Sequence, residues 1–179
     1  MRVLWRRLRK GFMNMKKANN ELNTRIKYKN MIPSKNCYEI IKSFEGLKLS
    51  SYLDGGGVAT IGYGSTMYKT GARVKIGQTI TIDDAQALLE WEINYKSIVV
   101  NSLTLKCRLT QNQFDALVSF TYNVGAGAFS NSTLLKKIKI NPNDPAIDIE
   151  FNRWNKDNGK TVEGLSKRRK KESNFYFSP

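Results

Sequence analysis

Three residues, Glu45, Asp54 and Thr60, have the types and the spacing that could perform acid–base chemistry. One carboxyl that keeps its proton and a second that is ionised suffice to hydrolyse a glycosidic bond. Glu45 lies at the predicted end of a helix with an apolar face, where partial burial favours a protonated acid, whereas Asp54 precedes glycines in an open turn where water keeps it charged. The Thr60 hydroxyl could hold a water molecule together with the carboxylate. Taken singly, a Glu at a helix end is usually a solvated charge and an Asp before Gly is usually a turn residue.

The chain contains no histidine among its 179 residues. This absence excludes Ser-His-Asp and Cys-His nucleophile systems, zinc sites with histidine ligands and histidine proton relays. Two cysteines, Cys37 and Cys107, are too few for a disulfide framework or a four-ligand zinc site. We expect them to be buried or free thiols, with a single bridge between them as the alternative.

The net charge of +15 favours a polyanionic partner, which could be nucleic acid, anionic lipid or a bacterial cell wall. Residues 1–30 carry ten basic side chains and one acid, a net +9, and the rest of the chain carries twenty basic and fourteen acidic groups, a net +6. We therefore divide the chain into a basic N-terminal extension, residues 1–30, and a catalytic domain, residues 31–179. The 40% of hydrophobic residues can supply one domain with a core.

The basic extension allows three interpretations. Leu4, Leu8 and Phe12 recur at helical spacing, which fits a short cationic amphipathic helix for a membrane or a wall. The alternatives are a flexible basic tail, or an upstream translated extension ahead of a later start such as Met31. The extension lacks the apolar run of about 7–15 residues that a secretory signal needs. We therefore expect a protein made in the cytoplasm without a signal peptide.

The elements that must position the three residues follow from periodicity and capping signals. An apolar stripe behind Ser34 predicts a helix that ends at Glu45, and alternation around the glycine-rich turn predicts a hairpin or a three-stranded sheet over 47–66. The later part is predicted to be helical. The predicted helices cover residues 81–100, 110–124, 131–138, a segment that begins at Asp144-Pro145, and residues 165–177. Gly125 and Gly127 are predicted to end the helix over 110–124. The predicted fold class is α+β, with a small antiparallel sheet lobe and a larger helical lobe.

The residues around the two carboxylates also carry a longer pattern. It consists of Phe44-Glu45-Gly46-Leu47, Tyr52, Asp54 and Thr60-Ile61-Gly62-Tyr63-Gly64, then 116–125 with 132–135, then Arg153-Trp154 with 164–169 and Glu172. This pattern resembles the phage-type lysozymes of glycoside hydrolase family 24, the endolysins of T-even and lambdoid phages. Their signature of Glu, eight residues, Asp, five residues, Thr matches at both spacings, and the similarity runs in the family's order from about residue 34 to 173.

The resemblance implies a reaction and a role for each residue. It implies hydrolysis of the β-1,4 bond between N-acetylmuramic acid and N-acetylglucosamine in peptidoglycan, with inversion at the anomeric carbon and with no cofactor or metal. Glu45 would be the general acid, Asp54 would position water and stabilise developing positive charge, and Thr60 would be the second ligand of that water.

The resemblance also implies how substrate binds. A lysozyme-like fold would place the active-site cleft between the sheet lobe and the helical lobe. Thr66, Tyr122 and Ser132 stand at matching substrate-contact positions, although ordinary packing or capping would explain each of them equally well. The family commonly has His after Gly64, and here the residue is Ser65, which we expect to weaken local support more than chemistry.

The expected biology is lysis of a bacterial host by a monomer that acts on glycan strands of the cell wall or periplasm. Because no signal peptide is recognised, the resemblance suggests release through a holin. Two other functions are kept as alternatives: a lysozyme-like wall-binding module that has lost turnover, and nucleic-acid binding through residues 1–30. No nucleic-acid recognition motif supports the second.

Overall fold

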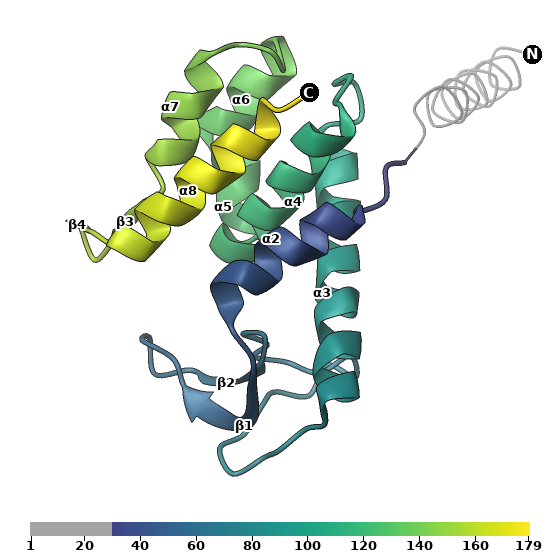
Figure 1. Ribbon diagram of the computed structural model, residues 1–179, viewed down its shortest axis with the longest axis vertical. Helices are drawn as coiled ribbons and strands as arrows, with labels where there is room; N and C mark the ends of the chain where they lie inside the picture. The colour runs from purple at the N-terminus through teal and green to yellow at the C-terminus, as the bar shows by residue number, and fades with distance from the viewer. Residues whose placement is uncertain (1–29) are drawn as a thin grey trace, which may run out of the picture. The chain divides into compact units, whose positions relative to one another are not determined.

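The structure is a computed structural model in which residues 30–179 are described (Figure 1). The interpretations of the basic extension, including the helix through Leu4, Leu8 and Phe12, lie outside the described residues. The elements of the described range are α2 (Lys35–Glu45), β1 (Lys48–Leu53), β2 (Ala59–Gly62), α3 (Ile82–Leu103), α4 (Gln111–Val124), α5 (Ala126–Asn131), α6 (Thr133–Ile140), α7 (Ala146–Asn152), β3 (Lys156–Asp157), β4 (Lys160–Thr161) and α8 (Glu163–Tyr176).

Met31–Pro179 form one unit with a sheet part and a helical part, as the α+β prediction requires. Figure 1 shows α2 running directly into β1, so that the end of this helix lies where the two parts meet. The long helix α3 packs on β2 at one end and on α4 farther along, and thereby joins the two parts a second time.

The sheet part is built on the antiparallel pair of β1 and β2. Tyr52 lies opposite Thr60, and Leu53 opposite Ala59, with an irregularity in register nearer the start of β1. The turn between the strands is closed by Asp54, whose Oδ1 accepts hydrogen bonds from the backbone N–H groups of Gly56 (2.9 Å) and Val58 (2.8 Å). Of the two predicted arrangements, the structure has the hairpin.

Most helix starts agree with the predicted capping signals. Ser34, Thr81 and Thr110 are the N-caps of α2, α3 and α4, and the last two complete capping boxes with the residue three positions later. The helix α3 continues three residues past the predicted end at 100, to Leu103. No helix within residues 30–179 is both long and apolar enough to cross a membrane.

Several predicted boundaries in the second half are wrong. Gly125 ends α4 with φ +89°, as predicted, but Gly127 lies inside the short helix α5 instead of ending a helix. The predicted helix 131–138 is shifted, because Asn131 ends α5 and Ser132 caps α6. The hairpin of β3 and β4 was not predicted, although Asn158-Gly159, with φ +47° and +78°, is the usual signal of a tight hairpin turn.

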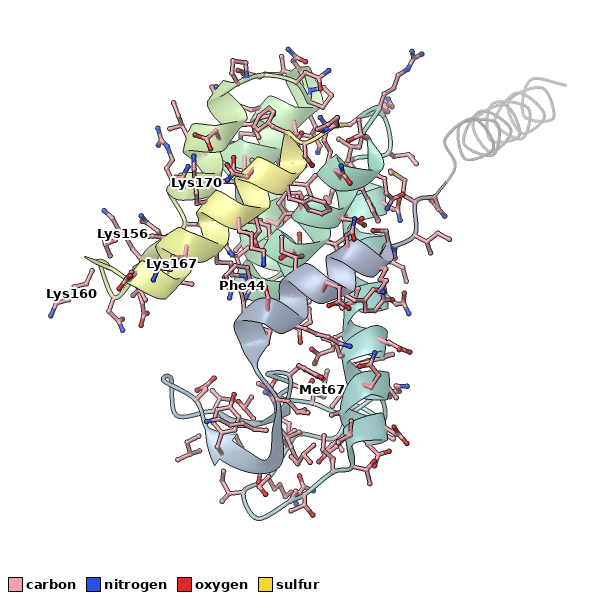
Figure 2. The ribbon with its side chains drawn as sticks, viewed as in Figure 1. Phe44, Met67, Lys156, Lys160, Lys167 and Lys170 are labelled. Atoms are coloured by element: carbon pink, nitrogen blue, oxygen red, sulfur yellow. The ribbon has the colours of Figure 1, made fainter. Side chains whose placement is uncertain are left out.

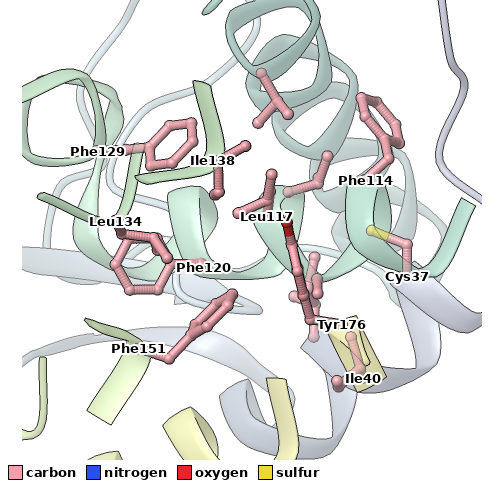
Figure 3. Packing of buried hydrophobic residues seen from close by; sticks show 14 of the residues in the cluster. Cys37, Ile40, Phe114, Leu117, Phe120, Phe129, Leu134, Ile138, Phe151 and Tyr176 are labelled. Atoms are coloured by element: carbon pink, nitrogen blue, oxygen red, sulfur yellow. The ribbon is translucent and has the colours of Figure 1, made fainter. Parts of the chain in front are cut away.

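The hydrophobic core surrounds α4, which packs against α2, α3, α5 and α8. Phe120 on α4 meets the rings of Phe129 and Phe151 edge to face, with centroids 6.0 and 5.4 Å away (Figure 3), and the ring of Trp154 at 5.6 Å. Cys37 is buried in the same core, and both Cys37 and Cys107 are free thiols, as predicted. The helical part therefore has a well-packed core that holds the ends of α2, α4 and α8 in place.

The cap of α3 provides a test of how the sequence fixes this fold. We predict that Thr81→Ala lowers the free energy of unfolding by about 1 kcal/mol, because the Thr81 hydroxyl accepts the N–H of Asp84 at 3.0 Å. Thr81→Ser, which keeps the hydroxyl, should lose much less in the same urea denaturation experiment. Equal losses in the two variants would contradict the capping role.

Candidate active site

Glu45 is the last residue of α2 and is held from both parts of the molecule. Its side chain is 18% exposed, and its Oε1 accepts a 2.5 Å hydrogen bond from Nη1 of Arg168 on α8. The start of α2 is fixed as well, because the backbone N–H of Ser34 donates to Oδ1 of Asp115 on α4 at 3.1 Å. The position of the Glu45 carboxyl is therefore determined by the helical part.

The second oxygen of Glu45 faces the sheet part at Gly64. A Cβ built on Gly64 would lie 3.2 Å from Oε2 of Glu45, and the backbone at Gly64 has φ +95°. A residue with a side chain would be strained there and would also press on the carboxylate. The glycine after Tyr63 thus lets the backbone approach Glu45.

Asp54 and Thr60 are linked through the backbone of Val58. Val58 donates its N–H to Asp54 Oδ1 at 2.8 Å, and its carbonyl accepts the Thr60 hydroxyl at 3.0 Å. Only Oδ1 of Asp54 accepts hydrogen bonds from the described part of the chain, which leaves Oδ2 available. The Thr60 hydroxyl uses its hydrogen in the bond to the Val58 carbonyl, and its oxygen can still accept a hydrogen bond.

Tyr52 brings the three predicted residues into one site. Burial raises the pKa of the Tyr52 phenol above its usual range, and the nearby charges of Glu45 and Asp54 raise it further. Tyr52 also lies directly opposite Thr60 in the β1–β2 ladder. The charges of both carboxyls therefore act on a side chain that pairs with Thr60 across the hairpin.

The three predicted substrate contacts have different surroundings. Tyr122 on α4 donates its hydroxyl to the carbonyl of Tyr63 at 2.9 Å, and so connects the helical part to the segment that carries Gly64. Ser132 is buried and caps α6, accepting the N–H of Leu135 at 3.0 Å and donating to the carbonyl of Phe129 at 2.7 Å. Thr66 is half-buried in the loop after β2.

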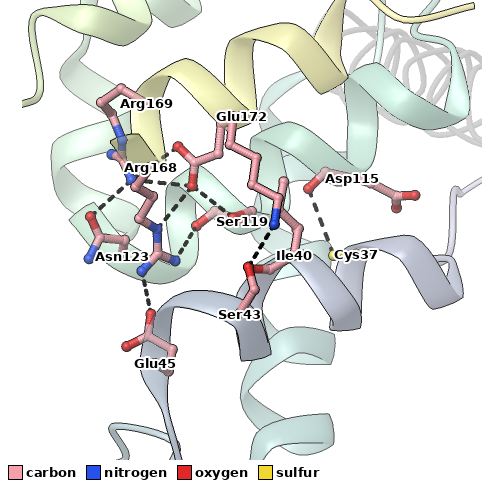
Figure 4. Close-up of polar contacts among 11 residues, drawn as sticks. Cys37, Ile40, Ser43, Glu45, Asp115, Ser119, Asn123, Arg168, Arg169 and Glu172 are labelled. Atoms are coloured by element: carbon pink, nitrogen blue, oxygen red, sulfur yellow. Dashed lines mark hydrogen bonds and ion pairs between the residues drawn. The ribbon is translucent and has the colours of Figure 1, made fainter. Parts of the chain in front are cut away.

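A buried polar network on α4 and α8 supports Glu45 (Figure 4). Arg168 donates through Nε to Glu172 Oε1 at 3.1 Å and through Nη2 to the carbonyl of Ser119 at 3.3 Å, in addition to its bond with Glu45. The Ser119 hydroxyl donates to the same Glu172 oxygen at 2.7 Å. Each of the three guanidinium nitrogens has a partner, so the fork has one orientation.

Arg169 extends this network on the other side of Glu172. Its Nη2 lies 3.0 Å from Glu172 Oε2 and 3.0 Å from Asn123 Oδ1, and its guanidinium carbon lies 4.8 Å from the centre of the Phe120 ring. Burial lowers the pKa of Arg169 to about 10 even though Glu172 counteracts it. Two guanidiniums thus meet two carboxylates, Glu45 and Glu172.

The remaining basic residues of this region behave differently. Lys156, Lys160, Lys167 and Lys170 extend into solvent from the β3–β4 hairpin and from α8 (Figure 2). Lys167 makes an exposed ion pair with Glu163 at 2.6 Å, one turn away on the same helix. The basic residues of this C-terminal region therefore form two groups: these lysines are solvated, whereas Arg168 and Arg169 are buried in the network beside Glu45.

Comparison with known proteins identifies the family of this chain. Residues 42–172 match the family model "Phage lysozyme". The chain belongs to the phage lysozyme family. An endolysin of Bacillus phage PZA is 44% identical over 142 residues, which are 78% of this chain and 52% of that protein. The endolysin of Salmonella phage P22 is 35% identical over 145 residues, 81% of this chain and 97% of that protein.

The fold agrees with the same family. The solved structure of an endolysin from Escherichia coli O157:H7 phage FAHEc1 superposes with a TM-score of 0.76 at 37% identity, and covers 84% of this chain and 96% of that one. The predicted lysozyme-like α+β class is confirmed. This chain spans about half the length of the Bacillus phage relative and nearly all of the P22 relative.

Sequence reasoning did not assign roles to several residues of this phage lysozyme site. Arg168 stood within the recognised C-terminal pattern, but its contact with Glu45 joins positions 123 residues apart. Gly64 stood within the recognised strand pattern, and only the structure reveals its approach to the carboxylate. Within residues 30–179, no group of three acidic, cysteine or histidine side chains is arranged to hold a metal ion.

The contact between Gly64 and Glu45 predicts a selective loss of activity. Gly64→Ala and Gly71→Ala both place a side chain at positive φ, +95° and +84°, and each should lower stability by about 1–3 kcal/mol. Only Gly64→Ala should displace Glu45, because nothing lies within 4 Å of a Cβ at Gly71. We therefore predict that Gly64→Ala clears peptidoglycan at least about tenfold more slowly than Gly71→Ala does, roughly the cost of misplacing a reacting group. Clearing is measured well below the melting temperature of each variant.

Equal activity of the two alanine variants would contradict this role of Gly64.

The network around Arg168 predicts a large cost for removing one buried charge. Arg168→Met should lower the free energy of unfolding by about 3–5 kcal/mol, because it leaves Glu172 buried without one of its two cations. Lys167→Met removes the same charge one residue earlier and should cost less than about 1 kcal/mol, since the Lys167–Glu163 pair is exposed. Chemical denaturation of both variants compares them directly.

Similar losses in Arg168→Met and Lys167→Met would show that the buried network contributes little.

Proposed function

We propose that the protein is an endolysin that hydrolyses the β-1,4 bond between N-acetylmuramic acid and N-acetylglucosamine in peptidoglycan. The observation that carries the proposal is that the charges of Glu45 and Asp54 both act on Tyr52, which lies opposite Thr60 in the β1–β2 pair. Two carboxyls in different surroundings are the minimum equipment for glycoside hydrolysis, and the family provides the substrate class.

In this proposal Glu45 is the general acid, and its Oε2 carries the proton. A guanidinium offers only donors, so Oε1, which accepts from Arg168, is the oxygen that stays unprotonated. Oε2 faces Gly64, where the absence of a side chain leaves room beside the acid. The proton passes from Oε2 to the leaving glycosidic oxygen as the bond breaks.

Asp54 and Thr60 act on the attacking water. The water donates one hydrogen to Asp54 Oδ2 and the other to Thr60 Oγ1, whose own proton is engaged by Val58. This arrangement directs a lone pair of the water at the anomeric carbon, and Asp54 takes up the proton that the water loses. The charge of Asp54 also stabilises the positive charge that develops on the sugar. Inversion of configuration is the expected outcome.

The glycan is proposed to lie in a cleft between the sheet part and the helical part. Thr66 is the proposed direct contact beyond the catalytic residues. Tyr122 supports the site through Tyr63, and Ser132 supports it by fixing the start of α6. The enzyme is proposed to act as a monomer on the wall of a bacterial host, without cofactor or metal, and to reach the wall through a holin.

Substitution of the acid tests the proposal. Glu45→Gln should reduce the clearing of purified peptidoglycan by at least about a hundredfold, because an amide cannot donate a proton to the leaving oxygen. Glu39→Gln, which removes an exposed carboxyl from the same helix, should leave the rate unchanged. Binding of Glu45→Gln to sedimented walls should persist.

Unchanged clearing by Glu45→Gln would contradict the assignment of the acid. An inactive native protein that still sediments with walls would favour the wall-binding alternative, and salt-sensitive DNA binding that depends on residues 1–30 would favour the nucleic-acid alternative.

A further inference from the structure

The last turn of α2, which ends at Glu45, has a second contact with α8 besides the bond from Arg168. Nζ of Lys171 donates to the hydroxyl oxygen of Ser43 at 2.9 Å (Figure 4). The Ser43 hydroxyl uses its own hydrogen in a 2.7 Å bond to the carbonyl of Ile40, so its oxygen is the acceptor for Lys171. Lys171 is thereby connected to the backbone of α2 through a single hydroxyl.

Phe44, the residue before Glu45, is contacted by two cations of α8. Nζ of Lys171 lies 5.3 Å from the centre of the Phe44 ring, and the guanidinium carbon of Arg168 lies 5.2 Å from it. A cation at this distance is attracted to the face of the ring. A positive charge beside the end of a helix also interacts favourably with the helix dipole. Lys171 therefore contacts both of the residues that precede Glu45, Ser43 and Phe44.

Little else joins α2 to α8. A groove lies between the two helices, and it is lined by Asn36, Glu39, Ile40, Ser43, Lys171 and Phe175. Within residues 30–179, the hydrogen bonds, ion pairs and cation–ring contacts between the two helices all come from Arg168 and Lys171. Because the groove leaves the rest of this interface without close packing, the position of the end of α2 on α8 depends on these two side chains.

The contacts of the two cations differ in how they depend on the charge of Glu45. A carboxyl that carries the proton for the leaving oxygen is neutral, and its bond from Arg168 then lacks the attraction between opposite charges. The contacts of Lys171 end on a hydroxyl and on a ring, so they do not depend on the charge of Glu45. They therefore continue to hold the end of α2 when the acid is ready to act.

We propose that Lys171 is a positioning residue that holds the last turn of α2 against α8 and so keeps the Glu45 carboxyl in place while it is protonated. Lys171 acts through Ser43 and Phe44 and does not touch the substrate. This role rests on the function proposed for Glu45. Loss of Lys171 should therefore slow the transfer of the proton and leave the binding of substrate nearly unchanged.

Kinetic measurements with soluble peptidoglycan fragments test the positioning role. Lys171 is exposed, so its replacement should leave the fold intact. For Lys171→Met, kcat should fall roughly two- to tenfold, the effect of one hydrogen bond and one cation–ring contact. KM should change by less than about twofold, because the contacts of Lys171 lie on the enzyme's own helix. Lys171→Arg, which keeps a donor and a cation, should restore most of kcat.

Lys170→Met is the matched control. It removes the same charge one residue earlier, from a side chain that extends into solvent, and it should leave kcat unchanged (Figure 2). Equal kcat values for Lys171→Met and Lys170→Met, or a loss that appears only in KM, would overturn the proposal.

A double-mutant cycle tests whether Lys171 acts through Ser43. Ser43→Ala should lower kcat in the native protein, because it removes the acceptor of the Lys171 bond. In a Lys171→Met background the same change should lower kcat much less, since the bond is already lost. Equal losses in the two backgrounds would contradict the path through Ser43.

Amide hydrogen exchange tests the same contact without using activity. Peptides that contain residues 42–45 should exchange roughly two- to tenfold faster in Lys171→Met than in the native protein or in Lys170→Met, because the last turn of α2 opens more often. Unchanged exchange in Lys171→Met would overturn the proposal. If Glu45→Gln remained active, the proposed acid would fail, whereas the exchange rates would still show whether Lys171 holds the end of α2.

Discussion

The buried guanidinium of Arg168 is the constraint on which the site depends, because a charge removed from water needs an opposite charge and hydrogen-bond partners beside it. Its guanidinium is buried between α4 and α8, where Glu172 and the Ser119 carbonyl take two of its three nitrogens. The third nitrogen, Nη1, donates to Glu45. The end of α2, and with it the entry into β1, therefore depends on a charge balance set inside the helical core.

Glu45 is consequently the point at which the two parts of the molecule meet. The helical part binds one oxygen through Arg168, and the sheet part approaches the other through Gly64. Tyr122 fastens the same sheet segment to α4. A carboxyl held in this way differs from Asp54, whose partners are the backbone amides of its own turn. This difference in surroundings fits the opposite roles proposed for the two carboxyls, with Glu45 as the acid and Asp54 as the group that positions water.

The sequence predicted those features that depend on neighbours along the chain. Ser34 and Thr81 begin helices because their hydroxyls replace missing hydrogen-bond partners within three residues, and Glu45, Asp54 and Thr60 lie on one hairpin and the helix leading into it. The bond between Arg168 and Glu45 depends on how α8 docks, which no local pattern encodes. Gly127 was misjudged because a glycine ends a helix only where the chain needs positive φ, and at Gly125 that need is already met.

The chemical nature of the cleaved bond tests the account most directly. Purified peptidoglycan digested by the native protein, reduced with borohydride and resolved by mass spectrometry, should yield disaccharide fragments ending in muramitol. Each fragment should be absent from a digest by Glu45→Gln. Fragments ending in reduced glucosamine or in anhydro-muramic acid, or stem peptides released from intact glycan strands, would contradict the assignment of Glu45, Asp54 and Thr60 to hydrolysis of the muramic acid bond.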